Sequence, residues 1–362
     1  MSVGFVERRA KDRWKARYRG PDGRERARTF ATSKEAHDFL AARTVDLRRG
    51  DWTDPKLGQI TVGEWGRLWL DRKAARLKPS TAASYRSLLD TCVLPEWERV
   101  RLGDVTYHEV DGWVARLSQR LGASRVRKAH VVLSQILDAA VKDGRLSKNP
   151  ARGVDLPRLP KREQRFLTQE QVHALAIAAG DYKPMVLVLA YCGLRFGEAA
   201  ALRVRNVDLM RGRIRVAGSV SEINGQLVWG TPKSHQARTV PLPRFLRDPL
   251  AEHMAGKGPE DLVFTSPDGT ALRNGNFRRR TWDPAARQVG LDGFTPHDLR
   301  HTTASLAVDA GANVKTLQQI LGHASAAMTL DVYAGLFDDS IDRLADRLDQ
   351  AYARPPCGLH AA

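Results

Sequence analysis

Residues 295–305 read TPHDLRHTTAS, and the chain continues with LGHA at 321–324 and TLDVYAG at 329–335. The first segment contains an HxxR pair, and the later segments add a second histidine and a tyrosine. An HxxR pair alone occurs by chance in many proteins, and a single tyrosine is more often a packing residue than a nucleophile. The information therefore lies in the order and spacing of the segments.

Two further segments precede these three, GLRFGEAAAL at 193–202 and TPKSHQARTVPL at 231–242. The five ordered segments span roughly residues 165–340 and resemble the catalytic domain of the tyrosine recombinases, the phage integrase family. The resemblance implies a mixed α+β domain that cuts and rejoins DNA through a covalent bond to a tyrosine. The residues that match the family's functional positions are Arg195, Glu198, Lys233, His297, Arg300, His323 and Tyr333.

The residue types suit phosphodiester cleavage, which needs a nucleophile, groups that stabilise charge and a proton donor for the leaving oxygen. A tyrosine hydroxyl is a weak nucleophile until its surroundings favour the phenolate. Two arginines can bind the non-bridging oxygens of a phosphate, and we assign that role to Arg195 and Arg300. The resemblance makes Tyr333 the nucleophile. It makes Lys233 the general acid that protonates the 5′-hydroxyl leaving group.

The resemblance also implies supporting roles. His297 is expected to act as an acid/base or phosphate ligand, and His323 to donate a hydrogen bond to the phosphate. Glu198 is expected to orient Arg195 or a neighbouring basic group. His301 directly follows Arg300 and therefore faces another way on a helix, so we expect packing or an indirect supporting bond there rather than chemistry.

Three other tyrosines could compete for the role of nucleophile, but none of them follows LGHA within one short helix: Tyr182, Tyr191 and Tyr352. His235 and Arg238 flank Lys233. We expect them to contact the phosphate backbone of DNA or to be solvated.

The charge balance indicates a polyanionic partner. The 362 residues include 58 Lys+Arg and 41 Asp+Glu, for a net charge of +17. Nucleic acid is the leading candidate, because neutralised phosphates release counterions. An anionic membrane surface is the alternative, but no stretch approaches the roughly 18 apolar residues of a membrane span.

Other features bear on cofactors and location. The three cysteines form no CxxC pair, which argues against a disulfide framework or a zinc site and fits a reducing cytoplasm. We expect a cytoplasmic protein that is associated with the nucleoid when bound to DNA. The sequence has no GxxxxGK[ST] loop and no carboxylate cluster that suggests two bound metals, so we expect neither ATP nor a metal as cofactor.

Residues 1–55 are expected to form a basic domain that binds arm-type DNA sites. Residues 13–19 alternate basic and apolar side chains, as a half-buried strand does. A turn at 20–23 then allows residues 24–30 to return as its partner, and Ser33 is expected to cap a helix. The region resembles the three-stranded sheet plus helix of phage integrases. The candidate DNA contacts are Arg13, Lys15 and Arg17.

Residues 58–150 are expected to form a four-helix, SAM-like core-binding domain. Capping boxes begin at Thr61 and Thr106, a third helix starts at Pro79, and a long apolar pattern runs from Ser124. Arg125, Arg127 and Lys128 on the polar side of the last helix are candidate DNA contacts, with ordinary solvated charges as the alternative. The segments 50–58 and 144–161 are predicted linkers.

Residues 163–349 are expected to form the catalytic domain, with a helix capped at Thr168 and three short strands at 213–216, 227–229 and 239–242. A helix carrying Ile341, Leu344 and Leu348 would dock on its own domain or on a neighbouring protomer. Residues 350–362 are predicted to be a disordered tail. The fold class is thus multidomain and mainly α, with small β parts.

The domain order resembles the three-domain phage-type integrases. It implies a homotetramer that synapses two double-stranded DNA attachment sites and exchanges strands through a 3′-phosphotyrosine and a Holliday junction, integrating and excising a mobile element. Candidate further partners are an excisionase and a DNA-bending host protein. The alternatives are a chromosome-resolving recombinase, a type IB topoisomerase and a non-catalytic DNA-binding regulator. Residues 1–50 argue against the chromosome-resolving recombinase, and the LGHA segment argues against the topoisomerase. The intact catalytic set argues against the non-catalytic regulator.

Overall fold

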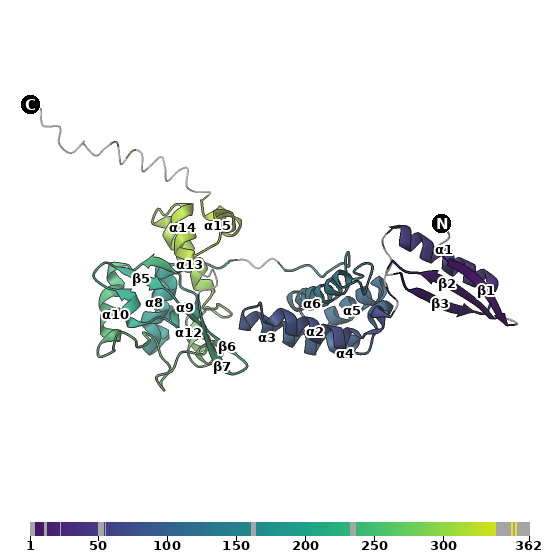
Figure 1. Ribbon diagram of the computed structural model, residues 1–362. Helices are drawn as coiled ribbons and strands as arrows, with labels where there is room; N and C mark the ends of the chain where they lie inside the picture. Colours follow the sequence, from purple (N-terminus) through teal and green to yellow (C-terminus); the bar gives the residue numbers. More distant parts are fainter. Residues whose placement is uncertain are drawn as a thin grey trace, which may run out of the picture. The chain divides into compact units, whose positions relative to one another are not determined.

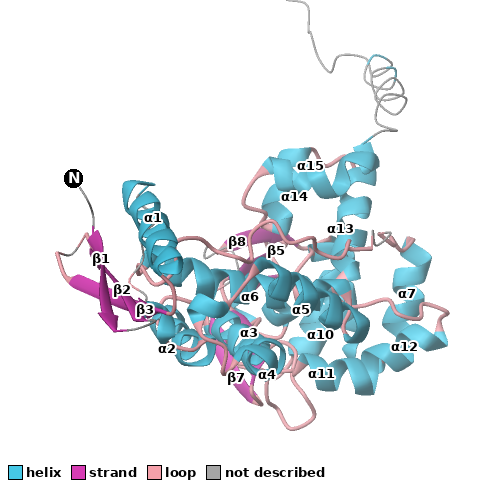
Figure 2. Ribbon diagram, turned by 90° about the vertical axis from the view of Figure 1, so that its right-hand side faces the viewer, coloured by secondary structure: helices cyan, strands magenta, loops and turns pink. Residues whose placement is uncertain are grey.

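The computed structural model describes residues 4–10, 13–21, 23–49, 54, 56–160, 164–231, 237–337, 349 and 352. The chain forms two compact units, residues 1–161 and 162–362 (Figure 1). In the described residues helices dominate, and strands occur in the N-terminal sheet and in small sheets of the second unit (Figure 2). The prediction of a mainly helical chain with small β parts is confirmed.

The N-terminal region contains the predicted three-stranded sheet and helix. Strands β1 (Gly4–Ala10), β2 (Arg13–Arg19) and β3 (Glu25–Phe30) are antiparallel in the order β1-β2-β3. Helix α1 (Ser33–Arg49) covers one face (Figure 1). The apolar face of β2 turns towards it, because Ala16 is fully buried and the ring of Tyr18 lies 5.9 Å from that of Phe39.

The predicted cap of α1 is wrong by one residue. The hydroxyl of Thr32 accepts a hydrogen bond from the backbone N–H of Glu35 at 3.2 Å, and the Glu35 carboxylate accepts one from the Thr32 N–H at 3.4 Å. Ser33 is instead the first residue of the helix. Thr32 takes the cap because only it has a glutamate three residues later, as a capping box requires.

The helical part of the first unit contains the four predicted helices. They are α2 (Val62–Ala74), the continuous stretch α3 (Pro79–Leu88), η2 (Leu89–Val93, a π-turn) and α4 (Leu94–Trp97), then α5 (Tyr107–Arg120) and α6 (Ala123–Lys142). Single 3₁₀ turns lie at η1 (Leu57–Gln59) and η3 (Leu102–Asp104). Both predicted capping boxes are present, at Thr61 and Thr106. The apolar face of α6 is buried against Trp65, whose Nε1 donates to the Ile136 carbonyl at 3.1 Å.

The first part of the predicted second linker belongs to this helical unit. Ala151 is fully buried, and its carbonyl lies 2.9 Å from His130 Nε2 of α6. The amide of Asn149 donates to the Ser134 carbonyl and to Asp138 Oδ1, both at 2.9 Å. The linker prediction is therefore wrong for these residues. The segment 144–161 was predicted as a linker from its prolines and basic residues. This composition does not reveal that α6 offers polar partners to Asn149.

Replacing Asn149 by alanine should lower the free energy of unfolding of this unit by about 1–3 kcal/mol, because buried partners on α6 and the Ala151 N–H lose their hydrogen bonds. Urea titration of the full chain followed by circular dichroism measures the change. Gln119→Ala, at an exposed position of α5, is the control and should be close to neutral. Equal midpoints for the two variants would show that 144–157 is only loosely attached.

The second unit combines helices with short strands. Its helices are α7 (Gln169–Ala178), α8 (Lys183–Cys192), α9 (Phe196–Ala199), α10 (Arg247–Met254), α11 (Asn274–Phe277), α12 (Asp283–Gln288), α13 (Asp298–Asp309), α14 (Val314–Leu321) and α15 (Ala326–Tyr333). Short 3₁₀ or π turns are η4 (Gly180–Tyr182), η5 (Val204–Asn206), η6 (Arg244–Leu246), η7 (Arg278–Trp282) and η8 (Ala334–Phe337). Helix α7 begins with the predicted capping box at Thr168.

The strands form two small antiparallel sheets. Strands β4 (Val207–Asp208), β5 (Arg213–Val216) and β8 (Arg238–Pro241) make one, and β6 (Ser219–Ile223) pairs with β7 (Gln226–Gly230) in the other. The three predicted strands correspond to β5, β7 and β8. Two strands were not predicted from the sequence. Strand β4 has only two residues, and the serines and glutamate of β6 weaken the apolar alternation.

The core of this unit surrounds α8, which is apolar on all sides and packs against α7 and α13. Helix α8 is capped at its C-terminal end by Gly193, which has the left-handed φ of 66°. A Cβ at Gly193 would lie 3.2 Å from Thr303 Cγ2 of α13, so glycine suits both the turn and the packing. The predicted helix carrying Ile341, Leu344 and Leu348 lies outside the described residues. So does the predicted tail over 350–362, except for Tyr352, which is exposed.

Candidate active site

Glu198 lies at the centre of a buried charge cluster. The turn at Gly193 sends the chain into α9, where Arg195 is the N-cap residue and Glu198 is the third residue of the helix. Glu198 Oε2 accepts a hydrogen bond from the backbone N–H of Arg195 at 2.9 Å, and Oε1 accepts one from Arg195 Nη1 at 3.0 Å. The Glu198 residue is only 2% exposed, so Arg195 is held in place by a carboxylate that water barely reaches.

The prediction that Arg238 contacts DNA or is solvated is wrong. Its side chain is 9% exposed and donates to both oxygens of Glu198, at 3.0 and 2.7 Å. Its Nε also donates to the Ile320 carbonyl at 2.9 Å. Because β8 pairs with β5 and packs against α14, the first residue of β8 points into the unit. Burial works to raise the pKa of Glu198, but the Arg238 hydrogen bonds and charge outweigh it and lower that pKa below the ordinary value.

Arg300 projects from α13 and is 3% exposed. Its Nη1 donates to the Gly193 carbonyl at 2.6 Å, and Nη2 donates to the Leu321 carbonyl. Burial, and then the charges of Arg195 and Arg238, lower the pKa of Arg300 to about 9. Three arginine charges thus meet one carboxylate in this cluster. The surplus positive charge suits an anion such as a phosphate.

His323 and Tyr333 complete the cluster from the last described helices. Helix α14 is capped at its C-terminal end by Gly322, which has a left-handed φ of 60°, and His323 follows. The His323 ring is parallel to the Tyr333 ring within 2°, at 6.3 Å between centroids, and its Nδ1 lies 3.0 Å from Thr329 Oγ1. Burial, and then the charges of Arg300 and Arg195, lower the pKa of His323 to about 4, so the ring is neutral near pH 7.

Tyr333 is the last residue of α15 and is 2% exposed. It packs against Ala304 and Val308 of α13 and against Leu317 and Leu321 of α14. Burial raises the pKa of its hydroxyl to about 12, although the charge of Arg300 opposes the shift. Tyr333 therefore does not ionise readily by itself.

His301, for which the sequence predicted packing or an indirect supporting bond, contacts the tyrosine hydroxyl directly. His301 Nδ1 lies 2.9 Å from Tyr333 Oη. The ring of His297, the residue before α13, lies 5.5 Å from the His301 ring. The signal in the sequence was the spacing of four residues between the two histidines, which places both on one face of a helix.

Two of the predicted site residues, Lys233 and His235, lie outside the described residues. They belong to the segment between β7, which ends at Gly230, and β8, which begins at Arg238. Within the described ranges, no group of three or more His, Cys, Asp or Glu side chains could hold a metal ion. None of the helices searched in those ranges is long and apolar enough to cross a bilayer.

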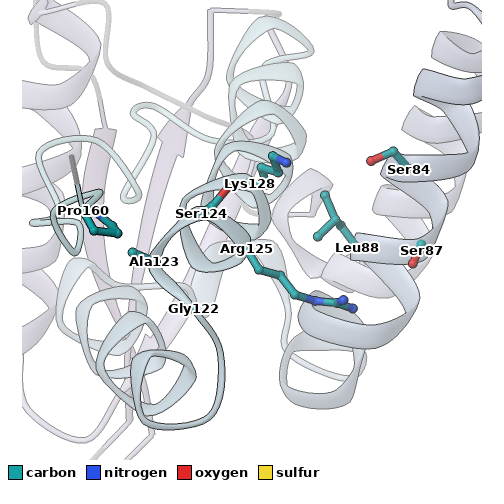
Figure 3. A pocket seen from close by; sticks show the side chains of 9 residues that line it. All are labelled: Ser84, Ser87, Leu88, Gly122, Ala123, Ser124, Arg125, Lys128 and Pro160. Carbon is teal, nitrogen blue, oxygen red and sulfur yellow. The ribbon is translucent and has the colours of Figure 1, made fainter. Parts of the chain in front are cut away.

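The candidate DNA contacts of the first unit divide into two kinds. Arg125 and Lys128 project from the exposed start of α6 and line a pocket of about 570 Å³, with Ser84 and Ser87 of α3 on the other side (Figure 3). Arg125 Nη2 also donates to Thr91 Oγ1 at 3.0 Å. Figure 3 labels the remaining lining residues, which are Leu88, Gly122, Ala123, Ser124 and Pro160.

Two of the other candidates, Arg127 and Arg17, are more strongly engaged in the fold. Arg127 Nη1 donates to the Pro157 carbonyl at 3.1 Å and ties the segment after Ala151 to α6. In the N-terminal sheet, Arg17 pairs with Glu7 and Glu25 on the neighbouring strands. Arg13 is exposed at the start of β2, and Lys15 is half-buried beside Glu7 and Thr29.

Family models match nearly the whole chain. The phage integrase family model covers residues 165–339, the phage integrase N-terminal domain 2–49 and the phage integrase central domain 62–155. The prophage phiRv2 integrase of Mycobacterium tuberculosis is 30% identical over 333 residues, which are 88% of each chain.

Solved structures share the fold. The Tn1549 transposon integrase in complex with a circular intermediate DNA matches with a TM-score of 0.68 at 20% identity, over 80% of this chain and 99% of that one. A lambda integrase tetramer bound to a Holliday junction matches with a TM-score of 0.57 at 16% identity, over 89% and 96% of the two chains. The fold, the buried arginine cluster and Tyr333 at the end of α15 together identify the chain as a tyrosine site-specific DNA recombinase. The chain belongs to the phage integrase family.

Proposed function

We propose that this integrase cleaves DNA by attack of Tyr333 on a phosphate held by Arg195 and Arg300. The observation that carries the proposal is the convergence of two arginines, His323 and Tyr333 from four separate segments, close enough for the arginine charges to act on both rings. The surplus of positive charge in this cluster matches the charge that gathers on a phosphate in the transition state. His297 and His323 assist at the phosphate, and Glu198 positions the arginines without taking part in the reaction.

The reaction is a transesterification. The Tyr333 hydroxyl gives up its proton and its oxygen bonds to phosphorus as the bond to the 5′ oxygen breaks, and Lys233 protonates the leaving 5′ oxygen to give a 5′-hydroxyl. The DNA then carries a 3′-phosphotyrosine link, and a 5′-hydroxyl from the partner strand reverses the step. The phosphodiester energy stays in the link, so the proposal requires no ATP. The buried arginines supply the charge that a metal would otherwise provide.

Each region of the chain has a place in this scheme. Residues 1–55 bind arm-type sites, the helical unit binds the core site, and residues 163–349 carry out the chemistry. Four protomers synapse two double-stranded attachment sites in the cytoplasm, at the nucleoid, and pass through a Holliday junction. Support for the tetramer comes from the fold shared with the lambda integrase assembly. An excisionase and a DNA-bending host protein would set the direction.

The test is a nicked suicide substrate that carries the chain's own attachment site. The 5′-hydroxyl fragment diffuses away after cleavage, so the covalent complex accumulates and survives denaturing gel electrophoresis. We expect this adduct with wild-type protein in the presence of EDTA and without ATP. Clear site binding without an adduct would contradict the proposal and would favour a non-catalytic DNA-binding regulator. An adduct that forms only after Mg²⁺ is added would contradict its metal independence.

The pocket in Figure 3 gives a second prediction. Removing both basic side chains in Arg125→Ala/Lys128→Ala should weaken core-site binding and flatten the slope of log K against log salt concentration. The expected reduction is about 1.8, from two lost phosphate contacts at about 0.9 each. Fluorescence anisotropy at several salt concentrations measures it. Arg116→Ala removes an exposed arginine of α5 that pairs with Glu96, and it should leave the slope unchanged. If the double variant and Arg116→Ala gave the same salt-dependence slope, the pocket would not be part of the DNA interface.

A further inference from the structure

The hydroxyl of Tyr333 has a hydrogen-bond partner that could take its proton. Tyr333 Oη and His301 Nδ1 are 2.9 Å apart, within the range that proton transfer to a general base requires. The two rings come from α15 and α13, and their centroids are 5.6 Å apart. The contact therefore joins two helices whose packing also buries the tyrosine.

Attack on phosphorus requires a group of this kind. With a pKa of about 12, only about one Tyr333 hydroxyl in 10⁵ would be ionised at pH 7. The charge of Arg300 lowers the pKa of Tyr333, but burial raises that pKa by more. A base that takes the proton as the new bond forms avoids the free phenolate altogether.

The other two histidines of the cluster are placed differently. The Nδ1 of His323 contacts Thr329 Oγ1, and its ring stacks parallel to the Tyr333 ring. Its pKa of about 4 also makes it a weak base. His297 lies one helical turn before His301, with its ring edge-on to the His301 ring at 5.5 Å between centroids.

We propose that His301 is a catalytic residue of this integrase, whose Nδ1 accepts the proton of the Tyr333 hydroxyl during cleavage and returns it during religation. The inference rests on the proposed role of Tyr333 as the nucleophile. In the forward step the O–H bond of Tyr333 breaks, a bond forms from its oxygen to phosphorus, and the proton moves to His301. Lys233 separately protonates the leaving 5′ oxygen, so the Tyr333 proton stays on the protein at His301 and one proton passes from Lys233 to the DNA.

Two variants separate proton transfer from mere placement. His301→Asn keeps a side chain that can hydrogen-bond to Tyr333 but cannot accept its proton, and His301→Ala removes the contact. With full-length protein and the suicide substrate, we expect both to form the adduct about 10²–10⁴-fold more slowly than wild type at unchanged site affinity. Added imidazole should restore part of the His301→Ala rate. His173→Asn, at an exposed position of α7, should react at the wild-type rate.

A substrate with sulfur in place of the bridging 5′ oxygen identifies which proton transfer has been lost. A thiolate leaves without protonation, so this substrate should restore cleavage in Lys233→Ala and leave His301→Asn slow. Wild-type rates for His301→Asn, or its rescue by the sulfur substrate, would overturn the proposed role of His301. No adduct in wild type, or an adduct that survives Tyr333→Phe, would instead contradict the role of Tyr333. The two failures are therefore distinguishable.

Discussion

Replacing Tyr333 by phenylalanine should abolish the covalent adduct while leaving attachment-site binding unchanged. The substitution removes one oxygen atom and its contact with His301, whereas the ring keeps its packing against α13 and α14. In other enzymes the loss of the nucleophile lowers turnover on the order of 10⁶-fold. For this protein such a loss means no detectable adduct. Denaturing electrophoresis of the suicide-substrate reaction measures cleavage, and anisotropy measures binding.

The chain offers matched controls for this variant. Tyr191→Phe removes a hydroxyl from a ring that packs edge-on against Phe245, and Tyr352→Phe removes one from a side chain that is 93% exposed. Both should form the adduct at the wild-type rate. A Tyr333→Phe protein that still forms the adduct would transfer the role of nucleophile to another residue.

Replacing Glu198 by glutamine should lower the free energy of unfolding by about 3–5 kcal/mol, the usual effect of removing one partner from a buried ion pair. Arg238 would then be buried without its carboxylate, next to the charges of Arg195 and Arg300. We also expect adduct formation to slow, because Arg195 loses the group that orients it. Urea titration measures the first effect, and the suicide substrate measures the second.

The difference in free energy of unfolding between wild type and Glu198→Gln should depend on pH in a definite direction. Because the folded-state pKa of Glu198 is lowered from 4.5, its carboxylate stabilises the fold fully above that value. The contribution is lost as the pH falls below 4.5 through the folded-state pKa, so wild type should approach Glu198→Gln in acid. Glu260→Gln is the control, because Glu260 pairs with Arg205 at the surface and should contribute about 1 kcal/mol or less. Equal losses in the two glutamine variants would contradict the buried-pair account.

Features set by local sequence were predictable. The capping boxes at Thr61, Thr106 and Thr168 lie where the sequence places them, because each cap needs only a partner three residues away. The apolar face of α6 likewise follows from the spacing of its side chains. The order of the five segments was enough to indicate the family. Local pattern and family resemblance thus account for most of the fold.

Features set by distant partners were not predictable in the same way. Arg238 is turned inward by a carboxylate 40 positions earlier in the chain, and from sequence alone it resembles any basic residue beside a lysine. Asn149 is buried because α6 offers it partners, although its surroundings have the composition of a linker. His301 acquires its contact only when α15 packs against α13. In each case the deciding neighbour lies on another element.

The most direct test of the central claim is to identify the residue that carries the DNA. Tryptic cleavage after Lys315 and Arg343 would release residues 316–343, which contain Tyr333 as their one tyrosine. The adduct would be trimmed with nuclease, digested with trypsin and fragmented in a mass spectrometer. We expect a 3′-linked nucleotide on Tyr333. A nucleotide on any other residue, or none on this peptide, would contradict it.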